Sequence, residues 1–258
     1  MPGHRDRRLE RMTQPRAARL LETSGTVVLA AGSVEQHGAH LPLGTDAFAA
    51  LTVAERVAER LDTVVAPLGP LGVAHYHLPW GGTLTLEPST LAAVVVDVCS
   101  SLRQSGVRRG VIVNWHEGNS PTLRLAADQA QRRFGLRVLI AEAHVITSSL
   151  FPDEMEFTHA GSMETAAVLA HEPALVRLDE RAPGSDPTAG GEAHELFRRR
   201  DVYPVLRDFH EIAPDGGWYG HPERADAARA EEVFEAVADH VVARVRELWA
   251  ALDPEVVR

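Results

Sequence analysis

The sequence contains no lysine, and Cys99 is its only cysteine. A single cysteine excludes an intrachain disulfide and a metal site built mainly from thiolates. The absence of lysine excludes Schiff-base catalysis and a lysine-bearing phosphate loop. No apolar run approaches the ~20 residues that span a bilayer, so we expect no membrane segment. With 258 residues and 45% hydrophobic content, the chain is long enough for one sizeable α/β domain with a full core.

Positive charge is also scarce, because 26 basic residues face 36 acidic ones and the net charge is −10. This balance argues against a nucleic-acid partner, since phosphate contacts need clustered cations. Residues 1–19 are rich in arginine but lack the apolar core of a signal peptide. We therefore expect a flexible, solvated N-terminal arm over 1–19, a single catalytic domain over 20–258, and a cytoplasmic location by default.

Short apolar segments alternate with segments of helical spacing along the chain. Strands are expected at Thr26–Ala31, 63–66, Arg109–Asn114 and 137–141. Helices are expected at 46–61, Pro88–Gln104, Ser120–Phe134, 163–170 and 225–252, and a loop at 183–191. This alternation predicts an α/β fold with a largely parallel sheet covered by helices on both faces. In such sheets, binding sites form outside the carboxyl ends of the strands.

The most informative stretch follows the first strand directly. It places Glu35, His37, His40 and Asp46 within twelve residues. Carboxylate and imidazole side chains are costly to cluster unless a cation holds them, so the stretch predicts a divalent metal site, with two ions the simplest reading. If the chain stays extended after Val34, Glu35 and His37 project to the same side. Asp46 has two oxygens that could bridge two ions.

Two further polar segments contain candidate site residues, and the first of them follows a strand, where sites form in such sheets. Residues 114–119, which include His116 and Glu117, follow an apolar strand. A capped turn would account for the asparagines there but leaves His116 unexplained. In the third segment His159 precedes an expected helix, and Glu164 lies in its first turn, where a carboxylate also complements the helix dipole.

Together the three segments resemble the creatininase family of metal-dependent amidohydrolases. The resemblance covers about residues 20–245 and rests on the stretch 32–42 with Asp46, on residues 114, 116 and 119, and on 159–161 with 164–165. It implies a three-layer α/β/α sandwich with a mostly parallel central sheet. It also implies two divalent ions per chain, variously zinc, manganese or iron, and a homo-oligomer such as a hexamer.

The resemblance also implies a distribution of metal ligands. Glu35 and His116 would hold one ion, His37 would hold the other, and Asp46 would bridge them. Creatininase itself carries a metal-binding glutamate two residues after the motif histidine, where this chain has Gly118.

The resemblance to family members with glycine at this position assigns the missing ligand to Glu164, and Glu117 stays open as an alternative ligand or a substrate contact. Glu164 and His159 match positions near the reacting group. We expect Glu164 to take a proton from a metal-activated water and His159 to donate one to the leaving nitrogen.

The expected substrate is a small cyclic amide, a formamide or a modified short peptide, whose amide C–N bond is hydrolysed. Trp115, His77 and Trp80 are expected to contact it, and Trp115 replaces a residue that is usually small in the family, which would narrow the pocket. Two other readings remain open: a non-catalytic metal-binding scaffold of the same fold, and a metal-dependent lyase or isomerase.

Overall fold

The structure is a computed structural model that describes residues 6–182, 184 and 205–252. Its centre is a parallel sheet with the strand order β2-β1-β3-β4. The strands are β1 (Thr26–Ala31), β2 (Val65–Pro67), β3 (Arg109–Asn114) and β4 (Arg137–Glu142). In the central register Leu29 pairs with Ile112, which pairs with Ile140 on the other side. The expected parallel sheet is confirmed.

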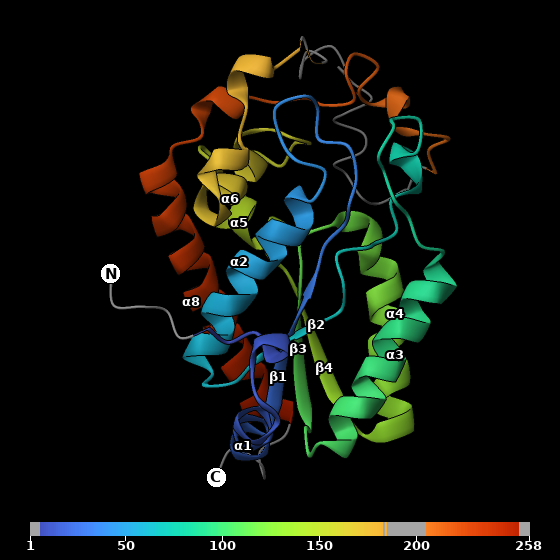
Figure 1. Cartoon of the computed structure of the whole chain (residues 1–258), viewed down its shortest axis with the longest axis vertical. Helices are drawn as coiled ribbons and strands as arrows, with labels where there is room; N and C mark the ends of the chain where they lie inside the picture. Colours follow the sequence, from blue (N-terminus) through green and yellow to red (C-terminus); the bar gives the residue numbers. More distant parts are fainter. Residues whose placement is uncertain (1–5, 183, 185–204, 253–258) are drawn as a thin grey trace.

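Helices cover both faces of this sheet (Figure 1). One layer holds α2 (Thr45–Arg60), α5 (Ala143–Leu150), α6 (Ser162–His171) and α8 (Ala227–Leu252). The other holds α1 (Gln14–Ser24), α3 (Pro88–Gln104) and α4 (Ser120–Phe134). Strand side chains alternate between the layers: Val28 packs toward the first and Leu29 toward the second. The three-layer α/β/α architecture is therefore confirmed.

Helix α2 positions part of the site, and its approach to β1 depends on a glycine. A Cβ atom added at Gly32 would lie 2.4 Å from the backbone nitrogen of Ala47, so a larger residue would push the helix away. The helix turns its small side chains, such as Ala50 and Ala54, to the core. This close packing sets Asp46, in the first turn of α2, directly beside the end of β1.

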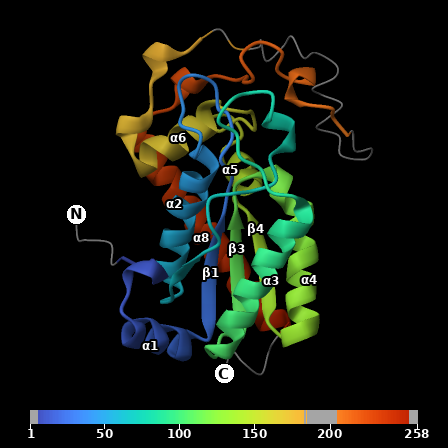
Figure 2. The same ribbon diagram turned by 45° about the vertical axis from the view of Figure 1, so that its right-hand side comes forward.

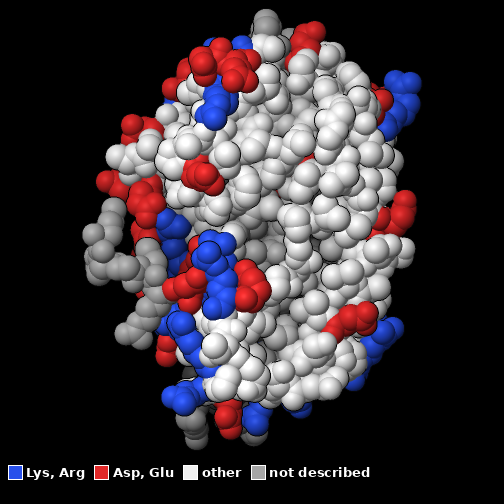
Figure 3. Space-filling view, in the orientation of Figure 1, with Lys and Arg blue, Asp and Glu red and all other residues white. Residues whose placement is uncertain are grey.

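Charged side chains gather on the outer side of α2 and α8. Arg56 Nη2 lies 2.6 Å from Glu231 Oε1, and Arg60 Nε lies 2.6 Å from Asp239 Oδ1. Figure 3 shows blue and red atoms side by side on the left of this face, whereas much of its right half is uncharged. Such partly exposed pairs contribute only about 0–1 kcal/mol each, so the apolar core determines the packing.

The N-terminal segment differs from the expected solvated arm. Helix α1 covers its second half, and Arg8 forms a parallel bridge with Val65 at the edge of the sheet. Arg7 is buried and its Nη2 donates to Asp62 Oδ1 at 2.8 Å. Arg11, Arg16 and Arg19 are exposed, as the composition suggested. The difference lies in Arg7 and in the partly buried Arg8, which pack against the domain.

The bounds predicted from the sequence match those of four elements: β1, α3, β3 and α4. Helix α5 was not expected, because its eight residues follow β4 without a break that the sequence pattern would mark. The loop expected over 183–191 lies outside the described residues, apart from Gly184. None of the helices in the described ranges has the length and apolar character that a bilayer crossing requires.

Candidate metal centre

The main hollow of the molecule lies at the carboxyl ends of the strands. The segments that follow β1, β3 and β4 rise to the same end of the sheet in both ribbon views (Figures 1 and 2). The hollow has a volume of about 1060 Å³. Its wall includes Glu35, Asp46, His116, His159 and Glu164, which come from segments far apart in the sequence. This is the edge at which parallel sheets usually place their ligands.

Three sets of three side chains each offer ligand atoms within 4.8 Å of one another: Glu35 with His37 and His159, Glu35 with Asp46 and His116, and His37 with Asp46 and Glu164. All of these side chains are buried. The last two sets share Asp46, whose oxygens face different imidazoles. Oδ2 lies 3.1 Å from Nδ1 of His116, and Oδ1 lies 3.4 Å from Nε2 of His37.

A second carboxylate completes each side of this arrangement. Glu35 Oε2 lies 3.2 Å from Nδ1 of His116. Glu164 Oε2 lies 3.5 Å from Nε2 of His37. The result is two adjacent groups of acid and imidazole, joined through Asp46.

Backbone carbonyls fix which ring nitrogen of each histidine faces the cluster. Nδ1 of His37 lies 3.0 Å from the backbone oxygen of Glu35, and Nε2 of His116 lies 2.9 Å from the backbone oxygen of Val73. A carbonyl oxygen only accepts hydrogen bonds, so each of these nitrogens carries a proton. The other nitrogen of each ring is then the one available to a metal, an arrangement common among metal-binding histidines.

Two atoms of the cluster make no well-aligned hydrogen bond. Nε2 of His37 and Oδ2 of Asp46 are buried and meet no hydrogen-bond geometry among the described residues, although each lies 3.1–3.5 Å from an ionisable group of the cluster. Buried polar atoms without partners are costly, and a cation between them would remove that cost. The donor set, three carboxylates and two imidazoles, suits zinc, manganese or iron. The residues present therefore fit the two divalent ions that the resemblance implies.

Electrostatics inside the cluster give the same picture. Burial raises the pKa of Glu35 to about 7 and that of Glu164 to about 8. Burial opposes the charged form of His37, but Asp46 and Glu164 outweigh it and raise its pKa to about 10. The same balance, with Glu35 as the main carboxylate, raises the pKa of His116 to about 9. Without a cation, the cluster therefore holds protons, and a metal would take their place.

His40, which lies in the same stretch of sequence as Glu35 and His37, belongs to none of the three ligand sets. Its Nε2 lies 2.8 Å from the backbone oxygen of Ala160, and the ring packs against Trp218 at 4.8 Å between centroids. Glu117 lines the hollow but belongs to none of the three ligand sets. Position 118 has no room for a side chain, because a Cβ there would lie 2.3 Å from the backbone oxygen of Val73.

His159 and His77 stack beside the cluster. The His159 ring centroid lies 4.5 Å from that of His37 and 4.7 Å from that of His77. Burial lowers the pKa of His159 well below its usual value and that of His77 to about 3. Nε2 of His159 lies 2.8 Å from the backbone oxygen of Gln36, and Nε2 of His77 lies 3.3 Å from Glu35 Oε1. His77 thus supports a carboxylate of the cluster as well as lining the hollow.

The aromatic wall differs in part from the expected one. Trp115 lines the hollow, and its ring packs on Phe234 of α8 at 5.5 Å. Trp80 is not among the described residues that line the hollow, and it stacks on His210 at 4.1 Å instead. Sequence reasoning missed the lining residues His144, Phe157, Phe209 and Tyr219. Most of them lie in loops or short turns, where no periodic pattern distinguishes a pocket residue from a packed one.

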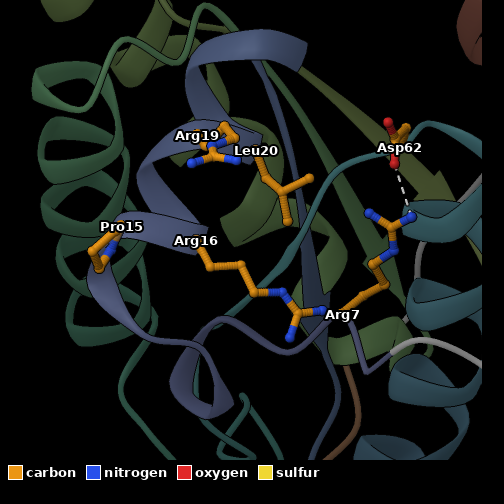
Figure 4. Close-up of a pocket in the computed structure, with 6 residues that line it drawn as sticks. All are labelled: Arg7, Pro15, Arg16, Arg19, Leu20 and Asp62. Carbon is orange, nitrogen blue, oxygen red and sulfur yellow. Dashed lines mark hydrogen bonds and ion pairs between the residues drawn. The ribbon is translucent and has the colours of Figure 1, made fainter.

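A second, smaller hollow has a different character. It has a volume of about 350 Å³ and lies beside α1 (Figure 4). Its lining residues are Arg7, Pro15, Arg16, Arg19, Leu20 and Asp62. Arg7 reaches across to Asp62, its ion-pair partner (Figure 4). Since these residues include no imidazole and only one carboxylate, the candidate metal centre belongs to the larger hollow alone.

A parallel α/β/α fold with buried acids and imidazoles at its strand ends is typical of metal-dependent hydrolases. The sequence profile described as "Creatininase: Creatinine amidohydrolase" matches residues 10–245. The chain therefore belongs to the creatininase family, whose hydrolases act on amide C–N bonds. This confirms the resemblance seen in the sequence.

Individual relatives cover nearly the whole chain. Creatinine amidohydrolase of Pseudomonas putida is 28% identical over 89% of this chain and 92% of its own length. Mycofactocin precursor peptide peptidase of Mycobacterium tuberculosis is 30% identical over 89% of this chain and 88% of its own length. A solved creatininase variant of Zn–Zn type aligns with a TM-score of 0.77 at 23% identity, over 94% of this chain and 98% of that one. At that identity, the structural likeness supports the fold alone.

Proposed function

We propose that the chain is a dinuclear metal-dependent amidohydrolase. In this proposal Glu35 and His116 hold one ion, His37 and Glu164 hold the other, and Asp46 bridges the two. One observation carries it: the two oxygens of Asp46 face the metal-binding nitrogens of two different buried imidazoles, at 3.4 Å and 3.1 Å. Without a cation, these acceptor atoms avoid mutual repulsion only by holding extra protons, and two divalent ions would replace those protons.

The chemistry follows from the residues that surround the cluster. When bound, two divalent ions supply an activated water and polarise the carbonyl of the amide. Glu164 accepts the proton that the attacking water loses. His159 lies beside His37 and lines the hollow, so it is placed to pass a proton to the leaving nitrogen. Because burial keeps its ring neutral at rest, that proton would be the one that Glu164 takes from the water, relayed during the reaction.

The shape of the hollow bears on the substrate. Its volume of about 1060 Å³ is far larger than a small cyclic amide needs, since drug-sized ligands occupy pockets of about 300–1,000 Å³. Phe157, Phe209 and Tyr219 line it together with Tyr76 and Met155. We therefore favour a short peptide with an apolar side chain next to the cleaved bond. Relatives include both a creatinine amidohydrolase and a peptide peptidase, so the family accommodates either size.

Metal analysis joined to a substrate screen tests the proposal. Protein purified without chelator should carry about two divalent ions per chain. It should hydrolyse an apolar short peptide faster than creatinine or a simple formamide, and the products should together gain the mass of one water. Bound metal without any hydrolysis would indicate a scaffold. A product of unchanged mass would indicate an isomerase, and a chain without bound metal would refute the proposal.

Assembly is a separate expectation. The homo-oligomer that the resemblance implies, with a hexamer as the expected size, can be measured by light scattering of the purified chain. A monomer at working concentration would contradict it and would leave the metal centre proposal intact, because every proposed ligand comes from one chain.

A further inference from the structure

Ala160 has an unusual backbone conformation beside the candidate metal centre. Its φ angle is +55°, in the left-handed region that residues with a side chain rarely adopt. Among the described residues only Asp62 shares this property without being glycine. Residues in such conformations persist where their surroundings hold them, and they concentrate at functional sites.

Contacts on both sides hold Ala160 in this conformation. Its backbone N–H donates to Oε2 of Glu164 at 2.5 Å. Its backbone oxygen accepts from Nε2 of His40 at 2.8 Å. The next residue packs closely as well, because a Cβ at Gly161 would lie 2.0 Å from Oγ1 of Thr158. Ala160 is therefore the link between the imidazole of His40 and the carboxylate of Glu164.

His40 is well placed to act as a fixed donor. It is fully buried, and its ring packs edge-on against Trp218 at 4.8 Å. The other ring nitrogen, Nδ1, has no hydrogen-bond partner among the described residues. The only hydrogen bond of the imidazole ring among these residues is therefore the one from Nε2 to the Ala160 oxygen. Since that oxygen only accepts, Nε2 carries the proton.

We propose that His40 is a positioning residue for Glu164. By holding Ala160 in the left-handed conformation, it aims the Ala160 N–H at Glu164 and so orients that carboxylate toward Nε2 of His37, 3.5 Å away. Partners that orient a metal ligand in this way commonly change metal affinity about 10–100-fold when lost. The inference rests on the proposed function, because it assigns Glu164 to one of the two ions.

Zinc titration against a competing chelator dye tests this role without an activity assay. We expect two ions per wild-type chain. His40→Met removes the donor while keeping an adaptable apolar side chain, and it should weaken one of the two sites about 10–100-fold while leaving the other unchanged. His40→Gln, whose side-chain amide can donate to the Ala160 oxygen, should recover most of the lost affinity.

The matched control is His171→Met. His171, the last residue of α6, stacks on Phe48 at 4.7 Å, and its hydrogen-bond contact is with Thr52 rather than with Ala160. This variant should bind both ions as the wild type does. Circular dichroism reports folding, and His40→Asn, whose amide is too short to reach Ala160, replaces His40→Met if that variant does not fold.

The possible outcomes distinguish a failure of the His40 positioning role from a failure of the proposed dinuclear metal site. Unchanged affinity at both sites in His40→Met overturns the positioning role and leaves the dinuclear proposal standing. A His40→Gln variant as weak as His40→Met also overturns it, since the ring would then act through packing and not through its hydrogen bond. A wild-type chain that binds no zinc overturns the proposed function and this inference with it.

Discussion

Replacing Asp46 with asparagine probes the shared carboxylate most directly. Asp46→Asn keeps the volume of the side chain, so it opens no cavity, but it removes the charge and one acceptor oxygen. Asp46 is 2% exposed, and its two oxygens face His37 and His116. If the carboxylate bridges two ions, this single substitution weakens both sites.

The expected size of the effect follows from ligand counting. Four-ligand zinc sites bind with about 10–16 kcal/mol, or roughly 3 kcal/mol per ligand at the lower end. Each 1.4 kcal/mol is about a factor of ten, so loss of one ligand weakens binding about 100-fold. In Asp46→Asn the ion that faces the amide nitrogen should lose this ligand, and the other should keep only a neutral carbonyl oxygen, so both sites should weaken. Substitution of a ligand that serves one ion should affect only that ion.

Zinc titration and circular dichroism provide the assay. Asp46→Asn should lose most of its metal during purification while keeping a near-native spectrum, because asparagine fills the same volume as aspartate and leaves the apolar core untouched. Asp97→Asn, on the exposed side of α3, is the matched control and should retain both ions. Retention of both ions in Asp46→Asn at unchanged affinity would refute the bridging carboxylate. If only one ion is lost, Asp46→Ala, which removes both oxygens, decides: retention of the other ion there as well would make Asp46 a ligand of one ion alone.

Three other expectations concern the same centre. Glu164→Gln should weaken one zinc site about 100-fold and Glu117→Gln neither, by the same titration; the reverse result would move the ligand to Glu117. Because burial raises the pKa of Glu35 to about 7 and of Glu164 to about 8, a metal must displace their protons. Zinc affinity should therefore rise between about pH 6 and 9, and a flat profile would contradict this. Gly118→Ala places a Cβ 2.3 Å from the Val73 oxygen. It should lower the free energy of unfolding by about 1–3 kcal/mol in urea titrations. An unchanged urea midpoint would contradict this and would show that the loop around position 118 shifts to accommodate the methyl group.

The sequence determined most of the scaffold. Apolar strands that alternate with helical spacing predicted the parallel sheet, and β1, α3, β3 and α4 have the expected bounds. Hydrophobic periodicity is a local property, so it can be read from neighbouring residues. The N-terminal segment was less predictable, because only the packed domain shows that Arg7 pairs with Asp62 and is not solvated.

The sequence also determined which residue types are available for the site, because acids and histidines directly follow the strands. Tertiary structure decided their arrangement. In the folded chain the His40 ring contacts Ala160 rather than the ligand sets, and Trp80 does not line the hollow. The backbone oxygen of Val73 accepts from Nε2 of His116 and so orients that ring. These outcomes depend on distances between segments that are far apart in the chain. Such distances arise only when the layers pack, and no local pattern encodes them.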